Sequence, residues 1–97
     1  MAADLIGRNQ ISRLEFTAAL QTFEKLIEQN YKYLPAYEQS AIAADSLGDY
    51  KKAAYFLERG YQLGLRDKTN IERLINYLQV AQYHTKAQKF RTILNKN

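Results

Sequence analysis

Residues 47–65, LGDYKKAAYFLERGYQLGL, form a helix-favouring run that carries glycine and alanine where an isolated amphipathic helix would use leucine. Gly48-Asp49 ends the helix before it, because glycine readily adopts the left-handed conformation that closes helices. The next helix is predicted from about Tyr50 to Leu63, and Gly64 stops it. Ala53 and Gly60 lie inside this run, and their small size indicates that other helices pack closely against it.

Three helices are predicted before this run, and the third of them ends where the run begins. A weak first helix carries Leu5, Ile6 and Ile11. A stronger second helix has apolar residues at i, i+3, i+4 and i+7 spacing, and Asn30 suits its end. These apolar residues are Phe16, Leu20, Phe23, Leu26 and Ile27. The third helix begins at Leu34-Pro35, since proline is tolerated in a first turn, and continues to Leu47.

Two more helices are predicted after Gly64. Thr69-Asn70 offers an N-cap for a fifth helix, whose apolar residues are Ile71, Leu74, Ile75 and Leu78. A sixth helix spans roughly residues 85–94, and its inward residues are Ala87, Phe90, Ile93 and Leu94. No β-alternation competes with this pattern, so the sequence predicts an all-α fold.

A repeat period of about 34 residues aligns the helices with one another. One column consists of Ala19, Ala53 and Ala87, and a second of Phe16, Tyr50 and His84. Three further columns are Phe23, Leu57, Arg91; Gly7, Ala41, Ile75; and Ala3, Tyr37, Ile71. The alanine column lets two helices cross closely. The aromatic column is expected to fill the space beside that crossing, which makes His84 a packing residue.

Composition limits the classes of protein that fit. The chain has 97 residues, enough for one domain with a modest core. It contains no cysteine, so disulfides, thiolate zinc sites and cysteine nucleophiles are excluded. No apolar run is long enough for a membrane span, and the N-terminal residues lack the order of a signal peptide. We therefore expect a soluble chain, in the cytoplasm or the periplasm, with the compartment left open.

The charges are distributed unevenly along the chain. Residues 1–49 hold four basic and seven acidic residues, whereas residues 50–97 hold ten basic and three acidic ones. The first half thus carries −3 and the second half +7, for a total of +4. Such an uneven charge distribution can steer an acidic partner toward the second half, although solvated helix faces produce the same pattern.

The repeat resembles the tetratricopeptide repeat, an antiparallel helix pair of the same length. The middle copy, residues 34–67, carries most of the likeness, and six of eight signature positions are acceptable. These are Tyr37, Ala41, the turn Gly48-Asp49-Tyr50, Ala53, Leu57 and Gly60. Ser40 and Leu65 depart from the family pattern. The first copy keeps Gly7, Phe16, Ala19 and Phe23, and the third keeps Ile71, Leu74, Leu78 and Ala87.

The resemblance implies three antiparallel helix pairs stacked as a short right-handed superhelix. Residues 1–97 would form one domain with repeats at approximately 1–33, 34–67 and 68–97, either alone or as part of a longer array. A generic helical bundle, or another helical repeat of similar length, is the alternative fold, and it would obey the same packing rules.

The family's usual function is to bind a partner polypeptide segment in a concave groove lined by the first helix of each pair. Carried over by position, the groove residues are Asp4, Arg8, Glu38, Ile42, Asp45, Glu72, Arg73, Asn76 and Gln79. This groove would be largely acidic with an apolar centre, which favours a partner segment with basic and aliphatic residues. An acidic chaperone tail is not expected as the partner. Members of the family that bind such a tail do so through a set of specific positions, and only Arg73 matches that set.

Other functions receive less support from the sequence. His84 is the only histidine, and no metal, cofactor or catalytic constellation is expected, so we expect a protein that is not an enzyme. Nucleic-acid binding through the basic last segment, with Lys86, Lys89, Arg91 and Lys96, lacks an aromatic platform, and the acidic first half would repel phosphates. A structural or oligomerisation unit of a longer solenoid is the main alternative. Residues 64–71 resemble loops that join repeats in bacterial envelope proteins.

Overall fold

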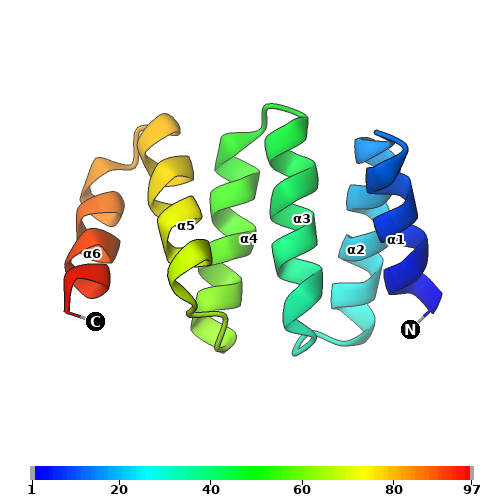
Figure 1. Cartoon of the computed structure of the whole chain (residues 1–97), viewed down its shortest axis with the longest axis horizontal. Coiled ribbons are helices and arrows are strands. Elements are labelled where there is room, and N and C mark those ends of the chain that lie inside the picture. The colour runs from blue at the N-terminus through cyan, green and yellow to red at the C-terminus, as the bar shows by residue number, and fades with distance from the viewer. Residues whose placement is uncertain (1, 97) are drawn as a thin grey trace.

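The computed structural model describes residues 2–96, and the regular secondary structure of this part of the chain is entirely α-helical. The helices are α1 (Ala2–Ser12), α2 (Phe16–Gln29), α3 (Leu34–Ser46), α4 (Tyr50–Leu63), α5 (Lys68–Val80) and α6 (His84–Asn95). They follow one another in chain order along the molecule and alternate in direction, which makes three antiparallel pairs (Figure 1). Each helix packs mainly against its neighbours in the chain. The all-α prediction is confirmed.

The repeat period is visible in the turns inside the three pairs. Leu14, Gly48 and Gln82 stand at equivalent positions of successive repeats, and all three have positive φ, at +62°, +77° and +68°. Each follows the end of an odd-numbered helix and reverses the chain into the even-numbered one. The prediction that Gly48 ends a helix in the left-handed conformation is confirmed. Gly64, with φ of +123°, ends α4 as predicted.

The cap assigned to α5 is wrong. The N-cap is Asp67, whose carboxylate accepts the backbone N–H of Asn70 at 3.2 Å, and the helix begins at Lys68. Asn70 lies within the first turn and is only 3% exposed. Asp67 and Asn70 are both common capping residues, and the choice between them depended on the burial of Asn70, which the local sequence does not reveal.

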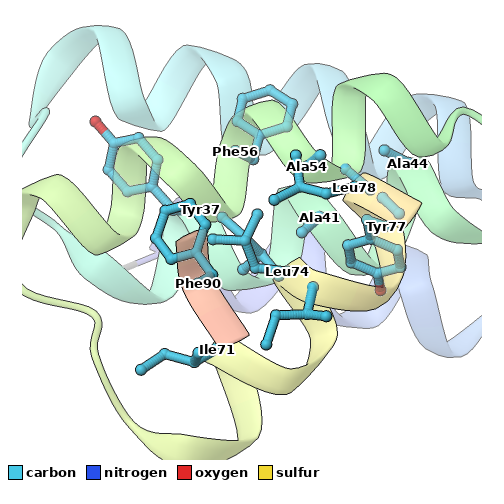
Figure 2. Close-up of a cluster of buried hydrophobic side chains, with 14 of the residues drawn as sticks. Tyr37, Ala41, Ala44, Ala54, Phe56, Ile71, Leu74, Tyr77, Leu78 and Phe90 are labelled. Carbon is cyan, nitrogen blue, oxygen red and sulfur yellow. The ribbon is translucent and has the colours of Figure 1, made fainter. Parts of the chain in front are cut away.

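Small residues lie where helices cross, as the alanine column predicted. Ala19, Ala53 and Ala87 are all 0% exposed. A Cβ atom on Gly60 of α4 would lie 3.2 Å from the Cβ of Tyr37 in α3, so larger side chains have no room there. The main core continues through α3, α4, α5 and α6, where Ala41, Ala54, Leu74 and Phe90 lie close together (Figure 2).

The aromatic column does not pack as predicted. Phe16 is half-buried, Tyr50 is 36% exposed, and His84 is exposed. These residues are the first residues of α2, α4 and α6. A side chain in the first turn of a helix contacts less of the neighbouring helices than one at the middle of the helix. Tyr50 stacks on Tyr77 of α5 with ring centroids 6.4 Å apart, whereas no further helix covers His84 in the described part of the chain. The packing role predicted for His84 is therefore wrong.

None of the helices in residues 2–96 is long and apolar enough to span a lipid bilayer.

Candidate functional site

The nine predicted groove residues lie on α1, α3 and α5, the first helices of the three pairs. Their positions follow the repeat period, so that Asp4, Glu38 and Glu72 are equivalent, and Arg8, Ile42 and Asn76 follow four residues later in each helix. Residues spaced by four and seven share one face of a helix. The structure therefore places one equivalent stripe on each of the three helices, and Arg73, one residue after Glu72, lies beside the stripe of α5.

Two hydrogen bonds join the stripe of α3 to buried residues of α5. The Asn70 amide donates to Glu38 Oε2 at 2.6 Å, and the Tyr77 hydroxyl donates to Asp45 Oδ2 at 2.8 Å. The two acids are seven residues apart on α3, and their partners are seven residues apart on α5. The bonds thus form two parallel rungs that fix the rotation and spacing of these helices. Both acids are half-buried and engaged inside the chain.

The tyrosine of the second rung is held in its neutral form. Burial raises the pKa of Tyr77, and the hydrogen bond to Asp45 raises it further. A phenolate in this position would lose its hydration and would face the Asp45 carboxylate. The hydroxyl therefore stays a donor at neutral pH, and the link between α3 and α5 persists there.

The stripe on α1 is also internally paired. Arg8 Nε donates to Asp4 Oδ2 at 3.0 Å, one turn along the same helix. The Asp4 side chain is 16% exposed and that of Arg8 is 46% exposed. The guanidinium is therefore the more accessible member of the pair, and this end of the stripe presents a cation as well as an acid.

The stripe on α5 is the most accessible. Glu72, Arg73, Asn76 and Gln79 are all exposed. Glu72 and Asn76 line a depression of about 340 Å³ whose remaining lining residues are Ile75, Arg91 and Leu94. Arg91 of α6 donates to the side-chain oxygen of Gln79, so Gln79 is tied to the neighbouring helix.

Arg91 was not among the predicted groove residues. It stands in the column of Phe23 and Leu57, which are 0% and 2% exposed, and a charged residue in a column of buried apolar ones is a signal that could have identified it. On α6 this position is half-buried, which leaves the guanidinium free to reach Gln79.

The groove residues include four acids and two arginines, so the expectation of a largely acidic groove, with Arg8 and Arg73 as isolated cations, stays a prediction. Of its four acids, Asp4, Glu38 and Asp45 have hydrogen-bond partners inside the chain, and Glu72 is the exposed one. Arg8 and Arg73 are both exposed, and the side chain of Ile42 is half-buried at the middle of the α3 stripe. The accessible surface is thus mixed in charge around an aliphatic centre.

No known protein-family model matches this chain, and no curated protein matches it either.

Proposed function

We propose that this protein is a non-catalytic interaction module of the tetratricopeptide-repeat type, which binds a segment of a partner polypeptide across α1, α3 and α5. The observation that carries the proposal is the pair of rungs from Glu38 to Asn70 and from Asp45 to Tyr77. They hold neighbouring stripes in a set geometry before any partner arrives, and preorganisation lowers the entropy lost on binding.

The repeat geometry supports the family part of the proposal. The buried alanine column and the three positive-φ turns recur once in every repeat, at the period of that family's helix pair. The half-buried stripe around Ile42 supports the binding part. It offers an aliphatic contact for one partner side chain, and Glu72 lies on the next odd-numbered helix to receive a basic one.

The first test is a capture experiment with a charge reversal in the stripe. Wild-type protein on a resin is used to isolate binding proteins, and overlapping synthetic peptides from these proteins identify the bound segment. Glu72→Lys should weaken binding of that segment at least about tenfold, because it replaces the exposed acid of the stripe. Isothermal titration calorimetry measures the affinity.

The matched control is Glu28→Lys, which makes the same charge change on the exposed surface of α2. It should leave the affinity within about twofold of wild type. Equal losses in the two variants, or full binding by Glu72→Lys, would contradict a binding site on the odd-numbered helices. Far-UV circular dichroism checks that both variants remain folded.

A second candidate function, a structural or oligomerisation unit, is favoured by one observation on α1. Ile6 is 53% exposed, whereas the equivalent residues Ser40 and Leu74 are 0% and 1% exposed because a preceding even-numbered helix covers them. Leu5, beside Ile6, is 61% exposed. If this face takes a helix of another copy, sedimentation velocity of the wild type will be concentration-dependent and Ile6→Glu will sediment as a monomer.

A further inference from the structure

The even-numbered helices carry a cleft of their own, separate from the stripes of the odd-numbered helices. Two adjoining depressions of about 250 Å³ each lie between α4 and α6, and both are lined by Tyr55, Glu58 and Lys86. The first continues to Lys51 and Tyr83, and the second continues to Arg59 and Gln62. Together with Ala54 of α4 and Leu78 of α5, these residues line one surface, which we name the α4–α6 cleft.

The cleft has an apolar floor between two exposed tyrosines. The floor is formed by Ala54 and Leu78, which are 2% and 1% exposed. Tyr55 is 58% exposed and Tyr83 is 43% exposed. Tyrosine combines a large apolar ring with a hydroxyl and loses little conformational entropy on binding, which is why it is enriched in binding surfaces.

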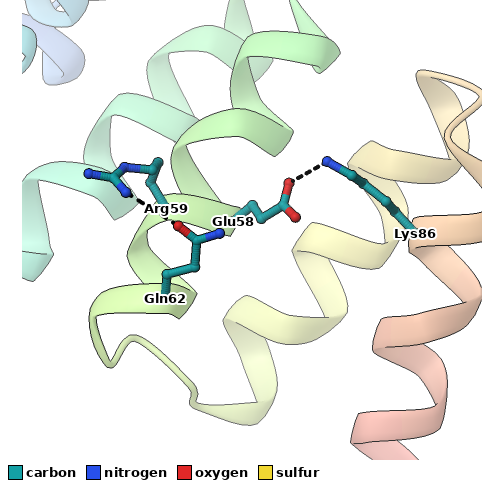
Figure 3. Close-up of polar contacts among 4 residues, drawn as sticks. All are labelled: Glu58, Arg59, Gln62 and Lys86. Atoms are coloured by element: carbon teal, nitrogen blue, oxygen red, sulfur yellow. Dashed lines mark hydrogen bonds and ion pairs between the residues drawn. The ribbon is translucent and has the colours of Figure 1, made fainter.

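Positive charge predominates in the cleft. The lining residues include three cations, Lys51, Arg59 and Lys86, and one carboxylate, that of Glu58. Lys86 Nζ lies 3.0 Å from Glu58 Oε1 and joins α6 to α4 across the cleft, while Arg59 donates to Gln62 along α4 (Figure 3). Lys51 is exposed. The net charge of the lining groups is therefore positive, which favours an anionic occupant.

The equivalent surface between α2 and α4 shows which side chains of the cleft are required for helix packing and which are not. Its ion pair, Glu24 with Lys52 at 3.6 Å, stands one repeat before the pair Glu58 and Lys86. However, Thr17, Gln21 and Asp49 occupy the positions of Lys51, Tyr55 and Tyr83. The same helix packing is thus built with neither the cation nor the aromatic rings, so packing alone does not explain them in the α4–α6 cleft.

The dimensions of the cleft indicate how long its occupant is. Lys51 and Gln62 are eleven residues apart on α4, which corresponds to about 16 Å at 1.5 Å per residue. An extended polypeptide rises about 3.3 Å per residue, so about five residues span this distance. One side chain of such a segment can contact the floor between the tyrosines while its neighbours face the cations.

We propose that the α4–α6 cleft binds an acidic, extended segment of a partner protein through one apolar or aromatic side chain placed between Tyr55 and Tyr83. Carboxylates on either side of this anchor pair with Lys51 and Arg59. A polypeptide fits better than a nucleic-acid strand, because Glu58 lies in the middle of the cleft and would repel an uninterrupted row of phosphates. The site does not depend on the function proposed for α1, α3 and α5.

The test uses a fluorescein-labelled pentapeptide with a central phenylalanine flanked by two glutamates on each side, and fluorescence anisotropy at low salt. Saturable binding is expected, with amide shifts confined to α4, α6 and the turn before α6 in a ¹⁵N-labelled sample. The double variant Lys51→Thr with Tyr55→Gln should weaken binding at least about tenfold. It remains folded because α2 carries those same residues at the equivalent positions.

Two controls separate this site from general charge attraction and from the other proposed surface. Arg13→Glu lowers the positive charge at an exposed residue of the turn between α1 and α2, at the other end of the row of helices from α6 (Figure 1), and should leave the affinity within about twofold. Glu72→Lys, which tests the stripe on α5, should also retain peptide binding. A peptide with lysines in place of the glutamates should not bind.

The proposal is overturned if the acidic peptide shows no saturable binding, or if Arg13→Glu weakens it as much as the double variant does. It is also overturned if the amide shifts fall on α3 and α5. Tighter binding of oligothymidylate than of the peptide, lost in the same double variant, would assign the cleft to single-stranded nucleic acid instead.

Discussion

Leu14 combines two features that are unusual for a leucine. Its φ is +62°, and its side chain is 73% exposed. The left-handed region costs an L-residue roughly 1–2 kcal/mol, and an exposed side chain contributes little packing to offset that cost. Gly48 occupies the equivalent position in the middle pair without this strain. The three turns therefore share one backbone geometry, but this geometry costs more free energy at Leu14 than at Gly48.

Replacing Leu14 with glycine should stabilise the protein. We expect Leu14→Gly to raise the free energy of unfolding by about 0.5–1 kcal/mol, because relief of backbone strain exceeds the added entropy of the unfolded chain. The denaturation midpoint in urea measures this effect. As a control, Leu5→Gly places glycine inside α1 at another exposed leucine and should lower stability by about 1 kcal/mol. A lower midpoint for Leu14→Gly would show that the leucine makes a stabilising contact.

At the scale of elements, α3 and α5 are joined by polar rungs in addition to apolar packing against α4. Asn70 donates to Glu38 and also to Asp67 Oδ1 at 2.8 Å, so one buried amide links α3 to the cap of α5. The second rung, between Tyr77 and Asp45, lies two turns further along. Removing a donor from such a rung leaves a half-buried carboxylate without its partner, which typically costs about 1–3 kcal/mol.

The second rung predicts how stability depends on pH. The pKa of Tyr77 is raised above its ordinary value of 10.0, chiefly by burial and then by its hydrogen bond to Asp45. Its contribution to stability is complete below about pH 10 and is lost as the pH rises toward the higher pKa of the folded state. The urea midpoint of the wild type should therefore fall above about pH 10.

The variant Tyr77→Phe should be less stable at pH 7 and should show a smaller decline above pH 10. The decline will not vanish, because burial also raises the pKa of Tyr37. Tyr83→Phe, which changes an exposed tyrosine that contributes to neither raised pKa, should keep the full decline of the wild type. If Tyr77→Phe declines as steeply as the wild type, the rung does not contribute to the alkaline loss of stability.

Over the whole molecule, contacts run along the row of helices in two linked layers. Hydrogen bonds join the odd-numbered helices α3 and α5, and ion pairs join the even-numbered helices α2, α4 and α6. The ion pairs are partly exposed, so each contributes at most about 1 kcal/mol. In such a row each helix depends mainly on its nearest neighbours, and the two outer helices have neighbours on one side only.

This arrangement predicts unequal local stability along the chain. We expect amide hydrogen exchange to be slowest in α3 and α4, which have packed helices on both sides, and fastest in α1 and α6. In α6 only Ala87 and Phe90 are fully buried, whereas α3 buries six residues. Exchange measured by NMR at near-neutral pH tests this order. Uniform protection from α1 to α6 would indicate a single cooperative unit instead.

The helices, their order and the repeat period can all be predicted from the amino-acid sequence alone. These features depend on local signals, such as the apolar spacing in residues 16–27, the proline at position 35 and the glycines at 48 and 64, which act within a few residues of where they stand. The burial of the alanine column could also be predicted, because a small residue repeated at one period marks a helix crossing.

The pairing of polar side chains, and hence which of them remain available to a partner, depends on the tertiary structure. Glu38 and Asn70 are 32 residues apart, as are Asp45 and Tyr77, and their contact depends on the rotation of α3 against α5, which the whole core sets. For the same reason the sequence marks Arg91 as unusual but does not predict that it reaches Gln79, nor that Tyr55 and Tyr83 flank one cleft. Local patterns assign a residue to a face of its helix, but the neighbouring helices determine whether that face is covered.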